Sequence, residues 1–404
     1  MKTGWPTKTL GEVCQFRGGG TPSKSVERYW RGDIPWVSPK DMKFDVVSDS
    51  IDHISQEAID GSATSLIPKD SVLMVVRSGI LARIVPIAIT GRDLTINQDL
   101  KALCPNEAMD ARFLYHLLDS KMDELLSMVS RGATVHRLMT EQIRALDFVL
   151  PPLAEQRRIV GLLDKTFEGL ATAKANAEKN LQNTRALFET HLQSVFTQRG
   201  PGWVETTLEK VLATQPQNGW SPPAANHSAS GTPVLTLSSV TGFHFRPNKR
   251  KFTSATTDSR RNYWIKNGDF LITRSNTPEL VGHVAIAEGI TEPTIYPDLI
   301  MRMNPAPDRM MTEFLYFQMR TQALRKEIMG RAQGANPTMK KISNGAVKTL
   351  PITVPPITTQ QAIVETMNEL TEETQRLTHL YERKLAALDA LRKSLLHQAF
   401  TGEL

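Results

Sequence analysis

The longest regular pattern of apolar positions along the chain is a heptad stripe that occurs twice. Apolar residues, with a few polar interruptions, recur alternately three and four positions apart, which predicts an amphipathic helix with one seam. The first helix is expected from Pro152 to Phe196 and the second over the last part of the chain. The expected seam positions are Leu163, Phe167, Leu170, Lys174, Ala177, Leu181, Thr184, Phe188, His191 and Val195, and then Ile363, Met367, Leu370, Thr374, Leu377, Tyr381, Lys384, Leu388, Leu391 and Leu395.

A seam of this length needs a partner, because a long row of apolar side chains is not stable in water. Two arrangements are open at this point. Each helix could pack on its own globular half of the chain. Alternatively, and this is the arrangement that we favour, the two helices pair with each other as an antiparallel coiled coil. The Pro and Gly residues of Arg199–Gly202 end the first helix.

Shorter patterns outside these helices predict mixed α and β structure. Ser71–Val76 and Phe270–Thr273 are apolar runs typical of buried strands. Residues 111–129 and 312–329 have the spacing of helices, with Asp110 and Thr312 as their expected N-caps.

The chain contains the same order of patterns twice. Trp5–Val13 returns as Trp203–Val211, and the Pro-Pro pair at 151–152 returns at 355–356. Arg77-Ser78 is matched with Arg274-Ser275, each after an apolar strand. We therefore expect an α+β protein with two mixed α/β target-recognition domains in tandem, pseudo-two-fold symmetric and separated by the two long helices. The expected segments are a first domain over 1–150, a helix within 151–200, a second domain over 201–350 and a helix within 351–404.

Composition excludes several classes of protein. The chain has 404 residues, 40% of them hydrophobic, and a net charge of +6, which permits a polyanion partner without requiring one. No apolar run reaches the roughly eighteen residues of a membrane span. Cys14 and Cys104 are the only cysteines, too few for a disulfide framework or a cysteine-based zinc site, and the cytoplasm is the expected compartment.

Motifs for catalysis are missing from the sequence. Gly18–Pro22 lacks the Gly-Lys-Ser/Thr ending of a phosphate-binding loop, so we expect a tight turn that presents Arg17 and Lys24. The Pro-Pro pairs have no Asn or Asp before them, as an adenine methyltransferase site requires, and no His-Glu-x-x-His motif is present. Asp99 and Asp298 recur at matching places and are interpreted as turn residues.

Three segments identify a resemblance. They are Gly19–Ser23 with Ile34–Val37, Leu150–Gln156 at the start of the first long helix, and the final Leu395–Leu404. With them the chain resembles the specificity subunit of type I restriction-modification systems over essentially its whole length. It departs from that family at Ile357–Gln360, where Leu-x-Glu-Gln is preferred, and near Asn218, where a clear Gly-Gly-Thr-Pro loop is absent.

The resemblance implies a function and a set of partners. Each domain would recognise one half of a split, asymmetric sequence in double-stranded DNA. The paired helices would bind two modification (methyltransferase) subunits, and restriction subunits would add translocation and cleavage. The chain itself would be non-catalytic and without a cofactor or metal, because S-adenosylmethionine, ATP and Mg are expected on the partner subunits.

Candidate DNA contacts lie in loops that combine Arg, Lys, Asn and Ser with Gly, because Arg can bind guanine and Asn can bind adenine through two hydrogen bonds. The candidates in the first half are Arg17, Lys24, Arg77, Ser78, Arg131, His136 and Arg137. Those in the second half are Asn218, Arg274, Ser275, Asn276, Asn336 and Lys340.

Two other functions stay open on the sequence alone. A coiled-coil scaffold that binds proteins without base readout would explain the heptads but not the duplicated domains. A stand-alone methyltransferase or nuclease is disfavoured by the missing motifs.

Overall fold

The computed structural model describes residues 4–132, 134–336, 338–401 and 403. Residues 402 and 404 of the final motif quoted above lie outside the described residues. The chain divides into two compact units, the first formed by Met1–Glu178 with Glu382–Leu404 and the second by Lys179–Tyr381. Each unit contains one globular domain together with a segment of each long helix. The expected fold class, two mixed α/β domains with two long helices, is confirmed.

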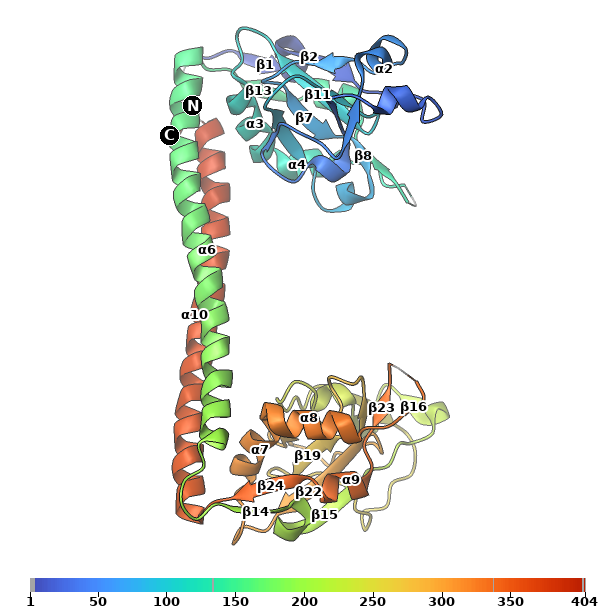
Figure 1. Ribbon diagram of the computed structural model, residues 1–404, viewed down its shortest axis with the longest axis vertical. Coiled ribbons are helices and arrows are strands. Elements are labelled where there is room, and N and C mark those ends of the chain that lie inside the picture. Colours follow the sequence, from blue (N-terminus) through green and yellow to red (C-terminus); the bar gives the residue numbers. More distant parts are fainter. Residues whose placement is uncertain (1–3, 133, 337, 402, 404) are drawn as a thin grey trace. The chain divides into compact units, whose positions relative to one another are not determined.

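The first unit is built on two antiparallel-rich sheets (Figure 1). Its central strand β7 (Val72–Val75) is buried on both faces, as its apolar run predicts. The five-stranded sheet has the order β2 (Cys14–Gly18), β11 (Leu100–Pro105), β7, β9 (Ile87–Thr90) and β4 (Val46–Val47). The four-stranded sheet has the order β5 (Asp52–Ile54), β3 (Ile34–Val37), β10 (Leu94–Ile96) and β6 (Leu66–Ile67). Two short ladders pair β1 (Thr7–Thr9) with β13 (Asp147–Val149), and β8 (Arg77–Ser78) with β12 (His136–Arg137). Short helices are α1 (Leu10–Val13), α2 (Gln56–Asp60) and α5 (Thr140–Arg144).

The second unit repeats this plan with a smaller sheet. Strand β19 (Phe270–Thr273) is buried and ends at the residues that its sequence predicts. The main sheet has the order β15 (Leu212–Asn218), β22 (Ile300–Pro305), β19 and β21 (Val284–Ile286), beside a second sheet of β16 (His227–Ser228), β18 (Arg250–Thr253) and β17 (Thr232–Leu235). Short ladders pair β14 (Val204–Thr207) with β24 (Pro351–Val354), and β20 (Ser275–Asn276) with β23 (Lys340–Lys341). Helix α9 spans Asn344–Lys348.

The helices expected over 111–129 and 312–329 are each broken in two. The first becomes α3 (Ala111–Ser120) and α4 (Met122–Ser127), and the second becomes α7 (Thr312–Arg320) and α8 (Gln322–Arg331). In the second pair Thr321 has an extended ψ and its side chain accepts a hydrogen bond from the Leu324 amide, so it ends one helix and caps the next. Asp110 caps α3 as expected, but Met311, not Thr312, is the N-cap residue of α7.

Both long helices form where the heptads predict them. Helix α6 covers Leu153–Thr197 and helix α10 covers Ile357–Thr401. In the first unit, Leu163 and Phe167 of α6 share one hydrophobic core with Leu395 and Leu396 of α10. The Lys174 Nζ atom donates to the Asp389 carboxylate over 2.8 Å. Residue numbers that rise along α6 therefore meet numbers that fall along α10, which is antiparallel pairing.

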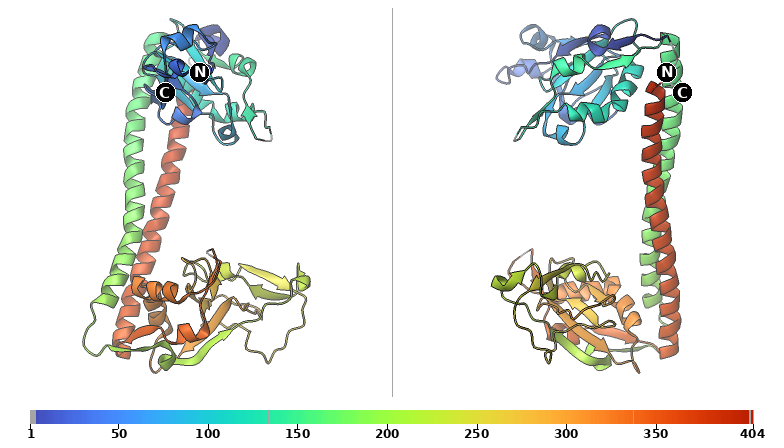
Figure 2. Two further views of the ribbon diagram at one scale, coloured as in Figure 1. Left: turned by 45° about the vertical axis from the view of Figure 1, so that its right-hand side comes forward. Right: turned by 180° about the vertical axis from the view of Figure 1, so that it is seen from behind.

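The helix segments of the second unit pair in the same direction. Leu192 and Phe196 of α6 share one apolar cluster with Ile363, Met367 and Leu370 of α10. Within each unit the two segments lie side by side in every view (Figure 2). They also pack on their own globular domain, since Ile159 and Val364 belong to the domain cores. The two arrangements left open by the sequence thus occur together.

The expected seam of α10 is wrong near its C-terminal end. Leu391 is exposed, whereas Leu388, Arg392 and Leu395 are partly buried. A straight helix turns once per 3.6 residues, so a strict seven-residue pattern drifts around its surface along many turns. The inward face has moved by one position, from Lys384 to Leu385 and from Leu391 to Arg392.

One buried glutamine fastens each long helix to its domain. The Gln156 side chain accepts a hydrogen bond from the Asp110 amide and donates to the carbonyls of Ala108 and Pro151. Gln360 accepts from the Met311 amide and donates to two matching carbonyls, those of Arg309 and Pro355. Both side chains are fully buried. The glutamine shared by the two Pro-Pro segments is therefore a structural residue.

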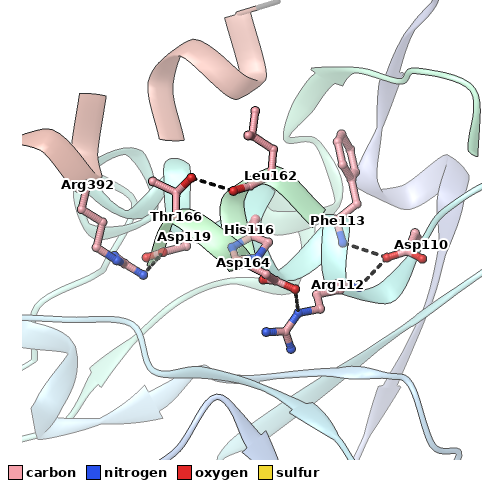
Figure 3. A network of polar contacts seen from close by, with 9 residues as sticks. All are labelled: Asp110, Arg112, Phe113, His116, Asp119, Leu162, Asp164, Thr166 and Arg392. Atoms are coloured by element: carbon pink, nitrogen blue, oxygen red, sulfur yellow. Dashed lines mark hydrogen bonds and ion pairs between the residues drawn. The ribbon is translucent and has the colours of Figure 1, made fainter. Parts of the chain in front are cut away.

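Polar contacts add to the first unit's attachment (Figure 3). Asp164 of α6 accepts hydrogen bonds from Arg112 and His116 of α3. Arg392 of α10 donates to Asp119 at the end of α3 over 2.7 Å. Helix α3 is thus bonded to both long helices. Because α3 also packs on the sheet of the domain, these bonds fix the domain to the helices.

Candidate nucleic-acid interface

The predicted DNA residues of the first unit meet in a two-stranded ribbon, β8 with β12. Ser78 pairs with His136 and Arg77 pairs with Arg137, although more than fifty residues separate them in the chain. Ser130 bridges to Arg137, which brings Arg131 to the same ribbon. The side chains of Arg77, Arg131 and Arg137 are exposed. The ribbon therefore carries a cluster of cations that can bind an anionic surface.

A matching ribbon, β20 with β23, holds three of the six candidates of the second unit. Ser275 pairs with Lys341 and Asn276 pairs with Lys340. Asn336, in the turn that precedes β23, is exposed, and Lys340 donates to the Gly334 carbonyl over 2.8 Å. The structure places Ser275 differently from the other candidates, because its side chain is buried and its hydroxyl contacts the Met339 sulfur.

The hydrogen bonds of the two ribbons shift the alignment of the two halves of the chain by one residue relative to the sequence match. Val76 accepts from the Leu138 amide, and the matching bond runs from the Ile342 amide to Arg274. Arg77 is therefore equivalent to Ser275, and not to Arg274 as the sequence match suggests. Because neighbouring residues of a strand point to opposite faces, a shift of one residue changes which side chain each ribbon presents. Lys341, equivalent to Arg137, is an exposed cation that the sequence analysis did not select.

A glycine loop lies beside the first ribbon. Strand β2 ends at Gly18, and a β-carbon on Gly19 would collide with the Ile96 carbonyl, so only glycine allows this approach. The Thr21 hydroxyl bonds to Gln98. The expected tight turn at Gly18–Pro22 is wrong, because the chain runs on without a turn until Lys24. Lys24 is exposed in that turn.

Arg17 precedes this loop on β2 and makes local contacts. Its guanidinium donates to the Gln15 side chain and to the Leu66 carbonyl. The side chain is half-buried, so it contributes positive charge beside the loop while it holds β2 to the neighbouring segment.

The second unit has the same loop, which the sequence comparison missed. Asn218 ends β15, and a β-carbon on Gly219 would collide with the Tyr296 carbonyl. The Ser221 hydroxyl bonds to Asp298, as Thr21 bonds to Gln98. The Asn-Gly-Trp-Ser-Pro segment therefore replaces Gly-Gly-Gly-Thr-Pro. The available signal was the shared order of a glycine, a hydroxyl residue two positions later and then proline.

The sequence match of Asp99 with Asp298 is wrong by one residue, because the Val76 amide donates to the Asp99 carbonyl and the equivalent Arg274 amide donates to the Leu299 carbonyl. Asp298 is therefore equivalent to Gln98, and each aspartate lies between its glycine loop and its ribbon. The Asp99 carbonyl accepts hydrogen bonds from the Val76 and Arg77 amides, and its carboxylate lies 3.8 Å from the Arg77 guanidinium. In the second unit the Arg274 guanidinium donates to the Asp298 carbonyl over 3.4 Å. Both aspartates thus have structural partners that place loop and ribbon side by side.

These surfaces offer binding chemistry. Exposed Arg and Lys side chains can bind phosphates or guanine, and the amides of Asn218, Asn276 and Asn336 can bind adenine. Asn276 donates to the Thr241 hydroxyl over 3.2 Å, which orients its amide. Over the part of the chain that the structure describes, no three His, Cys, Asp or Glu side chains are grouped to hold a metal ion. No helix among the same residues is long and apolar enough to cross a bilayer.

Comparison with known proteins gives a family match over both halves. A family model, the type I restriction modification DNA specificity domain, matches residues 2–181 and again residues 201–385. The EcoR124I/EcoR124II specificity subunit of Escherichia coli is 41% identical over 160 residues, which are 39% of this chain and 40% of that protein. The MjaIX specificity subunit of Methanocaldococcus jannaschii is 30% identical over 182 residues, 44% of this chain and 41% of that protein. The chain thus covers about two fifths of the length of these two relatives.

Longer matches exist at lower identity. The EcoKI specificity subunit of Escherichia coli is 25% identical over 316 residues, 75% of this chain and 67% of that protein. A chain from a structural study of complex assembly and conformational transition in the type I R-M system has a TM-score of 0.78 at 20% identity, over 100% of this chain and 99% of its own. The HsdS subunit from Thermoanaerobacter tengcongensis has a TM-score of 0.62 at 20% identity, over 100% and 98%. Both solved structures have the same fold as this chain.

Proposed function

The chain belongs to the family of type I restriction modification DNA specificity domains, and from this premise we propose that it is a DNA-recognition subunit of a restriction-modification complex. Each of its two domains recognises one part of a bipartite, asymmetric target in double-stranded DNA. The subunit itself carries out no chemistry. Its partners methylate adenine at N6 and restrict unmodified DNA.

One observation supports this proposal above the others: the same recognition framework is built twice with different side chains. Each unit joins a glycine loop, an aspartate-containing connection and a two-stranded ribbon. The first ribbon carries Arg77 and Arg137, whereas the second carries Asn276 and Lys341. Since base edges are distinguished by the donors and acceptors facing them, two unlike sets of side chains select two unlike half-sites.

The partners follow from the same proposal. Two modification subunits bind along the helix segments and bring S-adenosylmethionine, and restriction subunits bring ATP and Mg for translocation and cleavage. We place the assembly in the cytoplasm. A coiled-coil scaffold without base readout is less well supported, because it leaves the duplicated ribbons and glycine loops without a use.

The experiment is methylome sequencing of cells that express this chain with its modification subunits. The expected result is one split, non-palindromic motif methylated on adenine. The Arg77→Ala variant should relax or weaken recognition at one half-site only. The expected loss of binding free energy is about 1–3 kcal/mol, which is typical of one base contact. A uniform loss across unrelated DNA would identify Arg77 as a phosphate contact.

A matched control is Arg260→Ala, which removes an exposed arginine outside both ribbons. This variant should leave the motif unchanged. Absence of any sequence-specific methylation by the intact complex would contradict the proposed function itself.

A further inference from the structure

Four large aliphatic side chains are exposed around the first ribbon. Ile80 follows β8 by two positions, in the short 3₁₀ helix Gly79–Ala82, and Val135 directly precedes β12. Because Ser78 pairs with His136, Ile80 and Val135 flank the same end of the ribbon. The exposed fractions are 46% for Ile80, 45% for Ile84, 38% for Val135 and 49% for Met139.

The ribbon that these apolar side chains flank also carries positive charge. Arg77, Arg131 and Arg137 lie on the same ribbon and are exposed. The backbone continues the connection, since the Ile84 amide donates to the Ile80 carbonyl over 3.2 Å. Single exposed aliphatic side chains are ordinary on a protein surface, but a group of them among cations fits a partner that is anionic with an apolar spot inside it.

The major groove of DNA is such a surface. Its walls are phosphates, and the apolar group on its floor is the 5-methyl group of thymine. We propose that Ile80 and Val135 contact a thymine methyl group, so that the half-site recognised by the first unit contains a thymine detected by its methyl. This inference rests on the proposed function and adds a base identity to it.

The second unit differs at the corresponding place. Its exposed apolar side chain next to the ribbon is Met339, and the Met339 sulfur is engaged by the buried Ser275 hydroxyl at 3.3 Å. The positions equivalent to His136 and Arg137 are Lys340 and Lys341. The second ribbon therefore presents one such side chain where the first presents a pair, and we expect the larger thymine methyl effect in the half-site of the first unit.

The test uses the full chain assembled with its modification subunits and DNA duplexes that carry the mapped target. Each thymine of the target is replaced singly by deoxyuridine, which removes only the methyl group. We expect one replacement, in the half-site that Arg77→Ala affects, to weaken binding about fourfold, the equivalent of the roughly 0.8 kcal/mol for one buried carbon. Replacements in the other half-site should change the dissociation constant less than about twofold.

Protein variants complete the cycle. The double variant Ile80→Ala, Val135→Ala should bind the thymine-containing duplex about as weakly as the unaltered protein binds the deoxyuridine duplex. The double variant should also bind the two duplexes with equal affinity. The matched control is Ile51→Ala, which removes the same atoms from an exposed isoleucine outside the ribbon. It should keep the full deoxyuridine effect.

Three results would overturn the inference. The first is a half-site of the first unit without thymine, and the second is a dissociation constant unchanged by every deoxyuridine replacement. The third is a double variant, Ile80→Ala with Val135→Ala, that assembles less well with the modification subunits but keeps the deoxyuridine effect. That result would show that the two side chains contact a protein partner and not DNA. In all three cases sequence-specific binding remains, so the proposed function stands; loss of specific binding by the unaltered complex would end both.

Discussion

The two units attach their domains to the long helices with the same backbone arrangement but with side chains of opposite charge. Asp119 at the end of α3 and Arg320 at the end of α7 occupy equivalent positions and carry opposite charges. Asp119 pairs with Arg392 of α10, whereas Arg320 lies 3.6 Å from Glu189 of α6. One turn earlier, His116 bonds to Asp164, but its counterpart Phe317 packs among apolar residues.

Cation–π contacts occur in both units, but more of them surround the arginine of the second unit. In the first unit the Arg392 guanidinium lies over the Phe167 ring at 4.8 Å. The Arg320 guanidinium lies over the rings of Phe188, Phe243 and Tyr316 at 4.5, 5.2 and 5.3 Å. Phe243 reaches this position with a positive φ of 63°, which is unusual for a bulky residue and is held by stacking on His283. The attachment of the second unit thus uses more aromatic contacts, and that of the first unit has the shorter ion pair.

The two units share the contacts that a side chain makes to the backbone and differ in the contacts between side chains. The glutamines at 156 and 360 bind backbone atoms, and backbone geometry is common to both units. The docking side chains contact other side chains, so paired changes preserve the contact. An arginine in place of Asp119 would face Arg392, which indicates that each domain is matched to its own helix ends.

The largest effect is expected where the units agree. Gln156→Ala or Gln360→Ala removes three hydrogen bonds and leaves buried amides and carbonyls without partners, which should cost about 3 kcal/mol of unfolding free energy for the unit concerned. Thermal unfolding followed by peptide-resolved hydrogen exchange would show it. Gln142→Ala, at an exposed glutamine, serves as the control. Equal protection in variant and parent would contradict the assigned role of the buried glutamine.

Arginine truncation should affect the units unequally. The Arg320 side chain is only 12% exposed, against 41% for Arg392. Arg320→Ala should therefore cost about 2 kcal/mol and Arg392→Ala about 1 kcal/mol or less. Chemical unfolding of both variants tests the order. Arg320→Lys keeps the charge and loses the planar stacking, so a fully stable Lys variant would show that the rings contribute little.

Acid should weaken the second unit. Burial and then the nearby Arg325 cation lower the pKa of His283 to about 4. Its neutral ring accepts from the Gly242 amide and donates to the Glu279 carbonyl. Between pH 6.5 and 4 the unfolded chain holds one more proton than the folded one, so the unfolding free energy falls as the pH falls. His283→Gln should flatten this dependence, measured by thermal unfolding over the same pH range; an unchanged slope would assign the dependence to other groups.

His116 gives the first unit a similar but weaker dependence. Burial lowers the pKa of His116, while hydrogen bonding to Asp164 opposes the shift. The stability that this group contributes is again present above its ordinary pKa and decreases on acidification. His116→Phe, which introduces the second unit's residue, should remove this part of the dependence.

The smallest effect is expected from the exposed pair of Lys174 and Asp389, which links the two helix segments of the first unit. Both side chains are largely solvated, so Lys174→Ala should change the unfolding free energy by less than about 0.5 kcal/mol. A double-mutant cycle with Asp389→Ala measures the coupling. A larger value would show that this pair, rather than the apolar seam, aligns the helices.

Much of this architecture was predictable because it rests on local periodicity. The heptads located both long helices to within a few residues, and Phe270–Thr273 was identified as a strand from its apolar run. Short two-residue strands such as β8 and β12 carry too little pattern to be recognised. The breaks at Lys121 and Thr321 were missed because the apolar spacing continues across them, although Thr321 is a residue type that can cap a helix.

The candidate site was predicted by composition and assembled by the fold. Arg77, His136 and Arg137 were selected from separate loops, and the ladder joins them. Gly219 was missed because the need for glycine comes from the Tyr296 carbonyl, which is far away in the sequence. The one-residue error at Arg274 has the same origin, since a strand register is set by its partner strand.

The amino-acid order alone determined that this protein is a duplication with two long amphipathic helices and two mixed α/β domains, because repeats and helical periodicity are properties of neighbours along the chain. Only the tertiary structure decided which side chains share a ribbon, which glycines are obligatory and how each domain is attached to its helix segments. Those outcomes depend on close approach between distant segments, where a single residue of register changes the face that is presented.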